Sequence, residues 1–151
     1  MKAIFVVPGP EGGVFEYREI SVPSPAAGEL LIAIRAAGTN RGELIQRPLL
    51  RSSNPALRPL PAGIEFAGEI AALGDSVAAW RIGERVMGRG LGCYAEFTVV
   101  NERALMRMPD GMEFAGAAAT VGAGESVMVT AGPSGVGTAA LQIARLLRPT
   151  R

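Results

Sequence analysis

Glycine and proline interrupt this chain at short intervals, and no other feature limits its fold as strongly. The 151 residues include 20 glycines and 11 prolines, which are spread along the sequence instead of clustered. Because both residue types favour tight turns over helix interiors, this spacing is unusual for a helical protein. Up to Pro109 the segments between the turns are apolar or alternate apolar with polar residues, which predicts many short β-strands.

The expected strands lie close together along the chain. Their spacing is typical of a closed or nearly closed β-barrel. Gly68 permits a bulge in the longest of them, Asn40 is placed to cap a short helix over 41–46, and the proline-rich stretch 47–62 is expected to be an irregular loop. The predicted strands are 2–7, 14–20, 30–36, 64–73, 84–89, 93–100 and 104–108.

The character of the sequence changes after Pro109. A short helix is expected over 113–119, and then a strand over 126–130, a glycine-rich turn and a helix over 138–147. The sequence therefore predicts a mainly β fold with two parts. Residues 1–112 form the barrel, and 113–151 form a connecting helix and an incomplete dinucleotide-binding βα unit, because a parallel strand needs neighbours that do not follow here.

The glycine-rich turn has the chemistry that a pyrophosphate requires. Glycines let the anion approach the backbone, and the N-terminus of the next helix offers free N–H groups. A plain strand–turn–helix that uses glycine only for the bend is the alternative. The second strand of a dinucleotide fold, which would contact the ribose, is absent. The candidate cofactor-binding residues are Gly132, Ser134, Gly135, Val136, Gly137 and Thr138.

Composition excludes several function classes. The chain has no histidine and one cysteine, Cys93, which rules out an intrachain disulfide, a three-ligand His/Cys zinc site and histidine-based acid–base catalysis. Its net charge is +1 with the charges interspersed, which argues against nucleic-acid binding. The short apolar start is followed by turn residues, so no signal peptide or membrane span is expected, and a cytoplasmic location is predicted.

Several motifs together resemble one family. They are AAGTNRGELIQR at 36–47, GIEFAGEIAALGDSV at 63–77, WRIGERVMG at 80–88, GCYAEFTVV at 92–100 and AGESVMVTAGPSGVGTAALQIA at 123–144. The chain resembles the N-terminal part of the zinc-independent, zeta-crystallin-like quinone oxidoreductases of the medium-chain dehydrogenase/reductase superfamily. The resemblance implies a GroES-like β-barrel followed by a Rossmann domain. It also implies NADPH as the hydride donor, a quinone or conjugated carbonyl as the acceptor, and no zinc.

The resemblance also implies roles for single residues. Asn40 matches an asparagine beside the nicotinamide and substrate and is the candidate catalytic residue; a helix cap is its alternative role. Arg41, Gln46 and Tyr94 border the substrate cleft, although a strand tyrosine also serves as packing with a satisfied hydroxyl. Glu65, in an otherwise apolar strand, is expected to be structural and held by a nearby arginine.

The chain departs from the family in ways that leave two functions open. The helical connection between 113–119 and 126–130 is short and the rest of the Rossmann domain is missing, so the chain looks internally shortened and C-terminally cut. The first hypothesis is an NADPH-dependent quinone or enone reductase whose cofactor site is incomplete in this single chain. The second is a non-catalytic barrel remnant that forms a homodimer by strand addition, or binds a ligand or partner without turnover.

Overall fold

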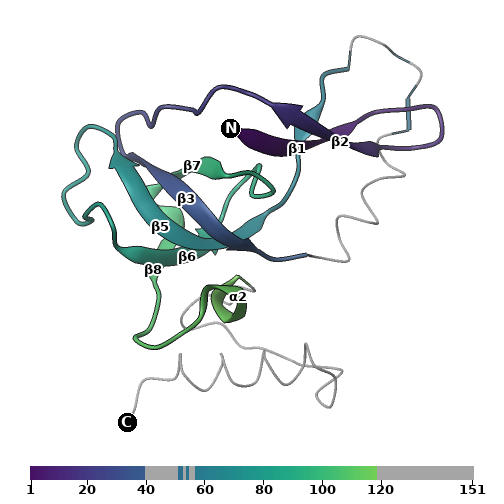
Figure 1. Cartoon of the computed structure of the whole chain (residues 1–151). Coiled ribbons are helices and arrows are strands. Elements are labelled where there is room, and N and C mark those ends of the chain that lie inside the picture. The colour runs from purple at the N-terminus through teal and green to yellow at the C-terminus, as the bar shows by residue number, and fades with distance from the viewer. Residues whose placement is uncertain (40–50, 53, 55–56, 119–151) are drawn as a thin grey trace, which may run out of the picture.

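The computed structural model describes residues 1–39, 51–52, 54 and 57–118 (Figure 1). This part of the chain is mainly β, as the sequence predicts, with one short α-helix and one 3-10 turn. The expected helix over 41–46 and the βα unit over 126–147 lie outside the described residues, as do all candidate site residues except Tyr94.

The described strands form two antiparallel sheets (Figure 1). The smaller sheet has the order β2-β1-β4, and the larger has the order β7-β3-β5-β6-β8. The predicted strands are recovered with small shifts at their ends. The elements are β1 (Lys2–Val7), β2 (Val14–Glu19), β3 (Glu29–Ala37), β4 (Leu60–Pro61), β5 (Glu65–Leu73), β6 (Arg85–Arg89), β7 (Phe97–Asn101), η1 (Glu102–Ala104), β8 (Leu105–Arg107) and α2 (Phe114–Ala117).

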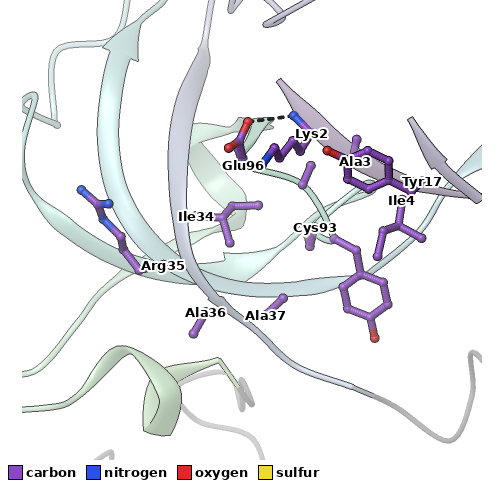
Figure 2. Close-up of a pocket in the computed structure, with 12 residues that line it drawn as sticks. Lys2, Ala3, Ile4, Tyr17, Ile34, Arg35, Ala36, Ala37, Cys93 and Glu96 are labelled. Carbon is purple, nitrogen blue, oxygen red and sulfur yellow. Dashed lines mark hydrogen bonds between the residues drawn. The ribbon is translucent and has the colours of Figure 1, made fainter. Parts of the chain in front are cut away.

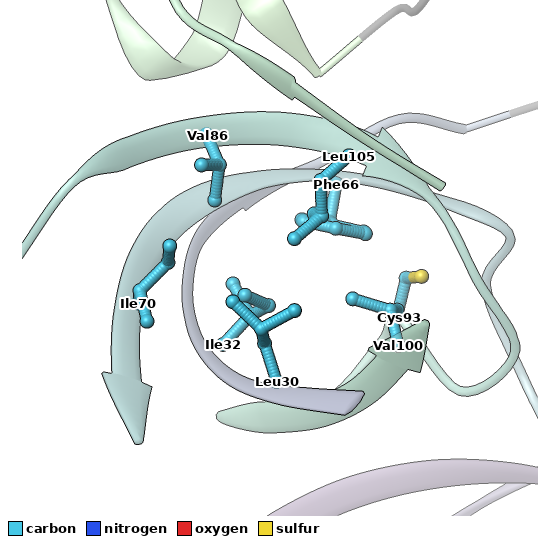
Figure 3. Packing of buried hydrophobic residues seen from close by; sticks show 8 residues of the cluster. All are labelled: Leu30, Ile32, Phe66, Ile70, Val86, Cys93, Val100 and Leu105. Atoms are coloured by element: carbon cyan, nitrogen blue, oxygen red, sulfur yellow. The ribbon is translucent and has the colours of Figure 1, made fainter. Parts of the chain in front are cut away.

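The larger sheet curls around an apolar core (Figure 3). Successive side chains of a strand point to opposite faces, so alternate residues of each strand meet inside the curl. Their burial removes apolar surface from water and supplies most of the stabilisation of the fold. The cluster comprises Leu30, Ile32, Phe66, Ile70, Val86, Cys93, Val100 and Leu105.

The opposite face of this sheet is also covered. Ala67 and Met87 alternate with the inner residues of β5 and β6 and pack against a second cluster that includes Met108, Ala117 and Ala118. The guanidinium of Arg85 lies 4.5 Å from the ring centre of Phe114. This contact holds α2 against the sheet, close to the end of β3.

The structure corrects the expected bulge at Gly68. The pairing of β3 with β5 shifts at two places: beside Gly68 the extra residue lies in β3, between Ile34 and Ala36, and the extra residue in β5 lies further along, opposite the step from Leu31 to Ile32. Gly68 is required by a close approach instead, because a Cβ there would lie 2.2 Å from the carbonyl oxygen of Ala33. The missing side chain therefore permits strand contact and not the bulge itself.

Two further expectations about strands were imprecise. Residues 93–100 do not form one strand, because β7 begins only at Phe97. The preceding segment crosses between the sheets: the Ile4 N–H donates to the Tyr94 carbonyl at 2.8 Å, and the Ile34 N–H donates to the Glu96 carbonyl at 2.9 Å. The stretch expected to be only a loop contains the short strand β4, which pairs with β1.

Arg107 holds the loop before β6 by a cation–π contact and an ion pair. Its guanidinium lies 4.3 Å from the ring centre of Trp80, and its Nε donates to Glu84 at 3.1 Å. We expect Arg107→Ala to lower the free energy of unfolding by about 1 kcal/mol, since the cation–π contact and a surface ion pair are both lost. Because the chain has one tryptophan, its emission should shift to longer wavelength as the ring loses this cover.

The matched control for this change is Arg103→Ala. Arg103 lies exposed on η1, and its backbone N–H, which the substitution keeps, donates to Asn101. Its substitution should leave the tryptophan emission unchanged. An unchanged emission in Arg107→Ala would contradict the assigned contact.

Candidate functional site

Two hydrogen bonds hold the chain at the end of β3, beside the candidate site. Gly38 follows the strand directly, and its N–H donates to the Glu65 carbonyl at 3.2 Å. Its own carbonyl accepts a hydrogen bond from the Tyr94 hydroxyl, also at 3.2 Å. The backbone is therefore held on both sides, two residues before the candidate catalytic residue Asn40.

Close packing leaves no room for a side chain at Gly38. A Cβ at this position would lie 2.7 Å from the Ala118 carbonyl oxygen and 2.9 Å from Oε2 of Glu65. Three elements thus meet here: the end of β3, the end of α2 and the start of β5. A larger residue would have to displace backbone, which is costly in a packed interior.

Gly63 leaves room for Tyr94, as Gly38 leaves room for the residues packed around it. Its φ of +88° lies in the region that favours glycine, and an added Cβ would lie 2.5 Å from the backbone nitrogen of Tyr94 and 2.7 Å from its ring carbon Cδ1. The Cys93 N–H donates to the Gly63 carbonyl at 3.1 Å. This glycine therefore sets the position of the tyrosine ring, and the tyrosine hydroxyl in turn holds Gly38.

Glu65 is paired with an arginine, as the sequence predicts. Its side chain is 13% exposed, and its Oε1 lies 4.0 Å from Nε of Arg89, which pairs with it across β5 and β6. The arginine side chain is 66% exposed, so solvent screens the attraction and the pair adds little stability. The main role of Glu65 in the geometry is to fill the space beside Gly38.

The chain between the end of β3 and Arg51 carries three of the candidate residues: Asn40, Arg41 and Gln46. They lie outside the described residues, but both ends of their segment are anchored. At the far end the Ser52 N–H donates to the Gly9 carbonyl at 2.8 Å, and Nε of Arg51 donates to the Pro10 carbonyl at 2.7 Å. The segment therefore connects the β1–β2 turn with the hydrogen bond from the Tyr94 hydroxyl to the Gly38 carbonyl, the Tyr94 clamp.

A surface pocket of about 370 Å³ lies beside the clamp (Figure 2). Tyr94, which the family resemblance predicts at the substrate cleft, is one of its lining residues. Sequence reasoning missed Lys2 and Tyr17, which come from the β1–β2 hairpin and carry no motif signal. The described lining residues are Lys2, Ala3, Ile4, Tyr17, Ile34, Arg35, Ala36, Ala37, Cys93, Tyr94, Ala95 and Glu96.

Within the described residues, no group of three or more Asp, Glu, Cys or His side chains is placed to hold a metal ion. Among these same residues, no helix has the length and apolar character needed to cross a bilayer.

Comparison with known proteins defines the class of fold and then its branch. Residues 26–110 match the alcohol dehydrogenase GroES-like domain. Quinone oxidoreductase of Homo sapiens is 36% identical over 161 aligned positions, which cover 94% of this chain and 48% of that protein. The chain thus spans about half the length of the curated relatives it matches.

Two solved structures support the same relationship. The Escherichia coli quinone oxidoreductase complexed with NADPH has a TM-score of 0.68 at 26% identity and covers 80% of this chain and 37% of its own. CurK enoyl reductase has a TM-score of 0.69 at 25% identity and covers 96% of this chain and 52% of its own. The chain belongs to the medium-chain dehydrogenase/reductase superfamily and, within it, to the quinone oxidoreductase branch.

Removal of the Tyr94 hydroxyl tests the clamp directly. We expect Tyr94→Phe to cost about 1 kcal/mol in the free energy of unfolding, because the Gly38 carbonyl loses a partly buried hydrogen bond while the ring packing stays. Amide hydrogen exchange should become faster at residues 38 and 39. The measurements are urea unfolding and exchange followed by mass spectrometry.

The other tyrosine of the chain provides the control. Tyr17→Phe removes a hydroxyl for which the described part of the chain shows no hydrogen-bond partner, so stability and exchange should be unchanged. Equal effects of the two substitutions would contradict a specific role for the Tyr94 hydroxyl.

Proposed function

We propose that this chain serves the reduction of a quinone or α,β-unsaturated carbonyl at the expense of NADPH. The observation that carries the proposal is its likeness, over 94% of its length, to a quinone oxidoreductase. Similarity to a structure solved with NADPH supports the choice of cofactor, and similarity to an enoyl reductase supports conjugated carbonyls as acceptors.

The proposed roles of the chain's own residues follow from their chemistry. The Asn40 amide, two residues beyond the Tyr94 clamp, orients the acceptor carbonyl and stabilises the negative charge that develops on its oxygen. Arg41 and Gln46 border the same cleft. Tyr94 contributes to the cleft through its ring, because its hydroxyl donates to Gly38.

The cofactor site in this proposal is the glycine-rich turn. Its donors are backbone N–H groups with the hydroxyls of Ser134 and Thr138, which suits a pyrophosphate. Gly132, Gly135 and Gly137 allow the close approach, and Val136 continues the turn. When bound, NADPH supplies the hydride. The proposed division places this unit after residue 112, in 113–151.

Zinc has no place in this proposal. The chain has no histidine, and its one cysteine, Cys93, is fully buried with its thiol donating to the Gly90 carbonyl at 3.3 Å. Such a donor set does not suit a catalytic zinc ion. A cytoplasmic homodimer completes the proposal, and the mass of the purified protein in solution tests the dimer.

The decisive experiment follows NADPH oxidation by the purified chain with duroquinone as the acceptor. Turnover above the rate without protein would support the reductase despite the incomplete cofactor site predicted for this single chain. In that case Asn40→Ala should lower kcat/KM at least tenfold, because one stabilised oxyanion contact is removed. Asn54→Ala is the matched control and should retain the rate. NADPH binding without turnover would refute the reductase and favour a non-catalytic binding protein.

A further inference from the structure

The pocket beside the clamp has walls that suit a flat apolar ligand. One wall is the β1–β2 hairpin, which contributes Ile4 and Tyr17, and the other is the end of β3 with Ile34 and Ala37. Figure 2 shows these side chains on two sides of the same space. Ala36 packs against the second core cluster, so Ala37, its neighbour along the strand, presents its methyl group to the opposite face. Its small side chain leaves the pocket open.

The floor of the pocket is firmly held. It is the crossing segment 93–96, whose backbone is bonded to three other parts of the fold. The Tyr94 N–H donates to the Ala62 carbonyl at 2.9 Å, and the Glu96 N–H donates to the Lys2 carbonyl at 3.0 Å. The Glu96 carboxylate also accepts from the Lys2 backbone N–H at 2.7 Å. A pocket with such a floor is preformed and needs little reorganisation to bind a ligand.

The polar groups of the pocket favour a ligand that accepts hydrogen bonds. The Lys2 ammonium and the Tyr17 hydroxyl are donors on exposed side chains, whereas the Glu96 carboxylate already accepts a backbone N–H. A ring with carbonyl oxygens has only acceptors at its edge and apolar faces between them. This combination matches the apolar walls and the donors together.

We propose that this pocket holds the ring of a quinone or similar planar conjugated carbonyl. The ligand class rests on the proposed function, but the binding step does not require hydride transfer. The pocket's volume of about 370 Å³ lies within the range of small-molecule sites. The acceptor would thereby be placed next to the Tyr94 clamp and the start of the Asn40 segment.

The test measures duroquinone binding to the full chain by ligand-observed NMR, in the absence of NADPH. Duroquinone is fully substituted, so it does not add to lysine or cysteine side chains at the ring. We expect saturable binding with a Kd on the order of 0.1 mM, which is typical for a ligand of this size. Two substitutions should weaken it at least tenfold: Ala37→Leu, which fills the pocket, and Tyr17→Ala, which removes one wall.

The control is Val14→Ala, on the same strand but the opposite face. Val14 is 59% exposed and Tyr17 is 57% exposed, so both substitutions leave the fold intact, which thermal unfolding verifies. Val14→Ala should bind duroquinone within twofold of the wild type. Because Tyr17 is exposed, its variant remains informative if Ala37→Leu fails to fold.

The outcomes separate this proposal from the proposed function. Absence of duroquinone binding, or equal binding by Tyr17→Ala and the wild type, would overturn the pocket. Binding that responds to both substitutions in a chain that does not oxidise NADPH would leave the pocket standing and refute the reductase. NADPH-dependent turnover with the same acceptor KM in Tyr17→Ala would support the reductase and overturn the pocket.

Discussion

Gly63→Ala is expected to lower the free energy of unfolding by about 3 kcal/mol, as the sum of two costs. An alanine at a φ of +88° is strained by about 1 kcal/mol or more. Its Cβ would also overlap the backbone nitrogen and ring of Tyr94, at 2.5 and 2.7 Å, and overpacking of this kind typically costs a further 1–3 kcal/mol, about 2 here. Urea unfolding followed by circular dichroism measures the total.

Gly83→Ala is a closely matched control for this change. Gly83 has a φ of +86°, almost the same as that of Gly63, but nothing lies within 4 Å of an added Cβ. Its alanine variant should therefore show only the backbone strain, about 1 kcal/mol. The difference between the two variants isolates the contact with Tyr94.

The functional consequence of Gly63→Ala follows from the same contact. A displaced Tyr94 ring cannot keep its hydroxyl 3.2 Å from the Gly38 carbonyl. The folded fraction of this variant should therefore show fast amide exchange at residues 38 and 39, as in Tyr94→Phe. Equal stability of the Gly63 and Gly83 variants would show that the overlap is relieved without cost and would refute this coupling.

Phe66→Ala should destabilise the protein by about 4 kcal/mol, the largest loss expected for a single truncation in the core. The ring is fully buried at the centre of the main cluster. Its tip faces backbone: Cβ atoms added at Gly88 and Gly90 would lie 3.2 and 3.9 Å from ring atoms of Phe66. Since rigid strands form this wall, the cavity cannot collapse well, and the cost approaches the upper range for such changes.

Leu91→Ala serves as the reference for a truncation outside the core. Leu91 is 77% exposed, so its substitution should change the free energy of unfolding by less than about 0.5 kcal/mol. A loss below about 2 kcal/mol in Phe66→Ala would show that the sheet closes around the vacated space. Denaturant midpoints at a constant m-value provide the comparison.

Most strands of the described part could be predicted because their signal is local. In β5 the apolar residues Phe66 and Ile70 belong to the inner cluster, whereas Ala67 belongs to the outer one, and this arrangement reflects the period of two along the strand. The predicted strand begins one residue before the observed Glu65–Leu73 and ends at the same residue. Glycine and proline mark the turns, so element positions need no tertiary information.

The crossing segment 93–96 could not be separated from β7 in the same way. Its residues alternate as well as those of the strand that follows, but their backbone groups bond to β1, to β3 and to the turn at Ala62 and Gly63. A segment that hydrogen-bonds to several partners shows the same apolar–polar alternation as a segment in one continuous ladder. The two-residue strand β4 was not predicted, because two residues among prolines show no alternation. Only their pairing with β1 makes them a strand.

For the candidate site, the sequence placed Tyr94 at the cleft but left open whether its hydroxyl faces a ligand or the protein. The structure directs that hydroxyl to the Gly38 carbonyl, 56 residues away in sequence. Lys2 and Tyr17 were not candidates at all, because the chain folds the N-terminal hairpin beside β3 only in three dimensions. Conversely, the roles of Asn40, Arg41 and Gln46 rest on sequence motifs and remain predictions.

The amino-acid sequence was sufficient to predict that the barrel part consists of short strands and that Glu65 needs a cationic neighbour. These conclusions depend only on residue type, local periodicity and composition. Only the folded chain shows that Gly63 sets Tyr94 against Gly38 and that the hairpin forms one wall of a pocket. Hydrogen bonds and steric contacts between distant residues depend on how the sheets pack, and no local pattern encodes that packing.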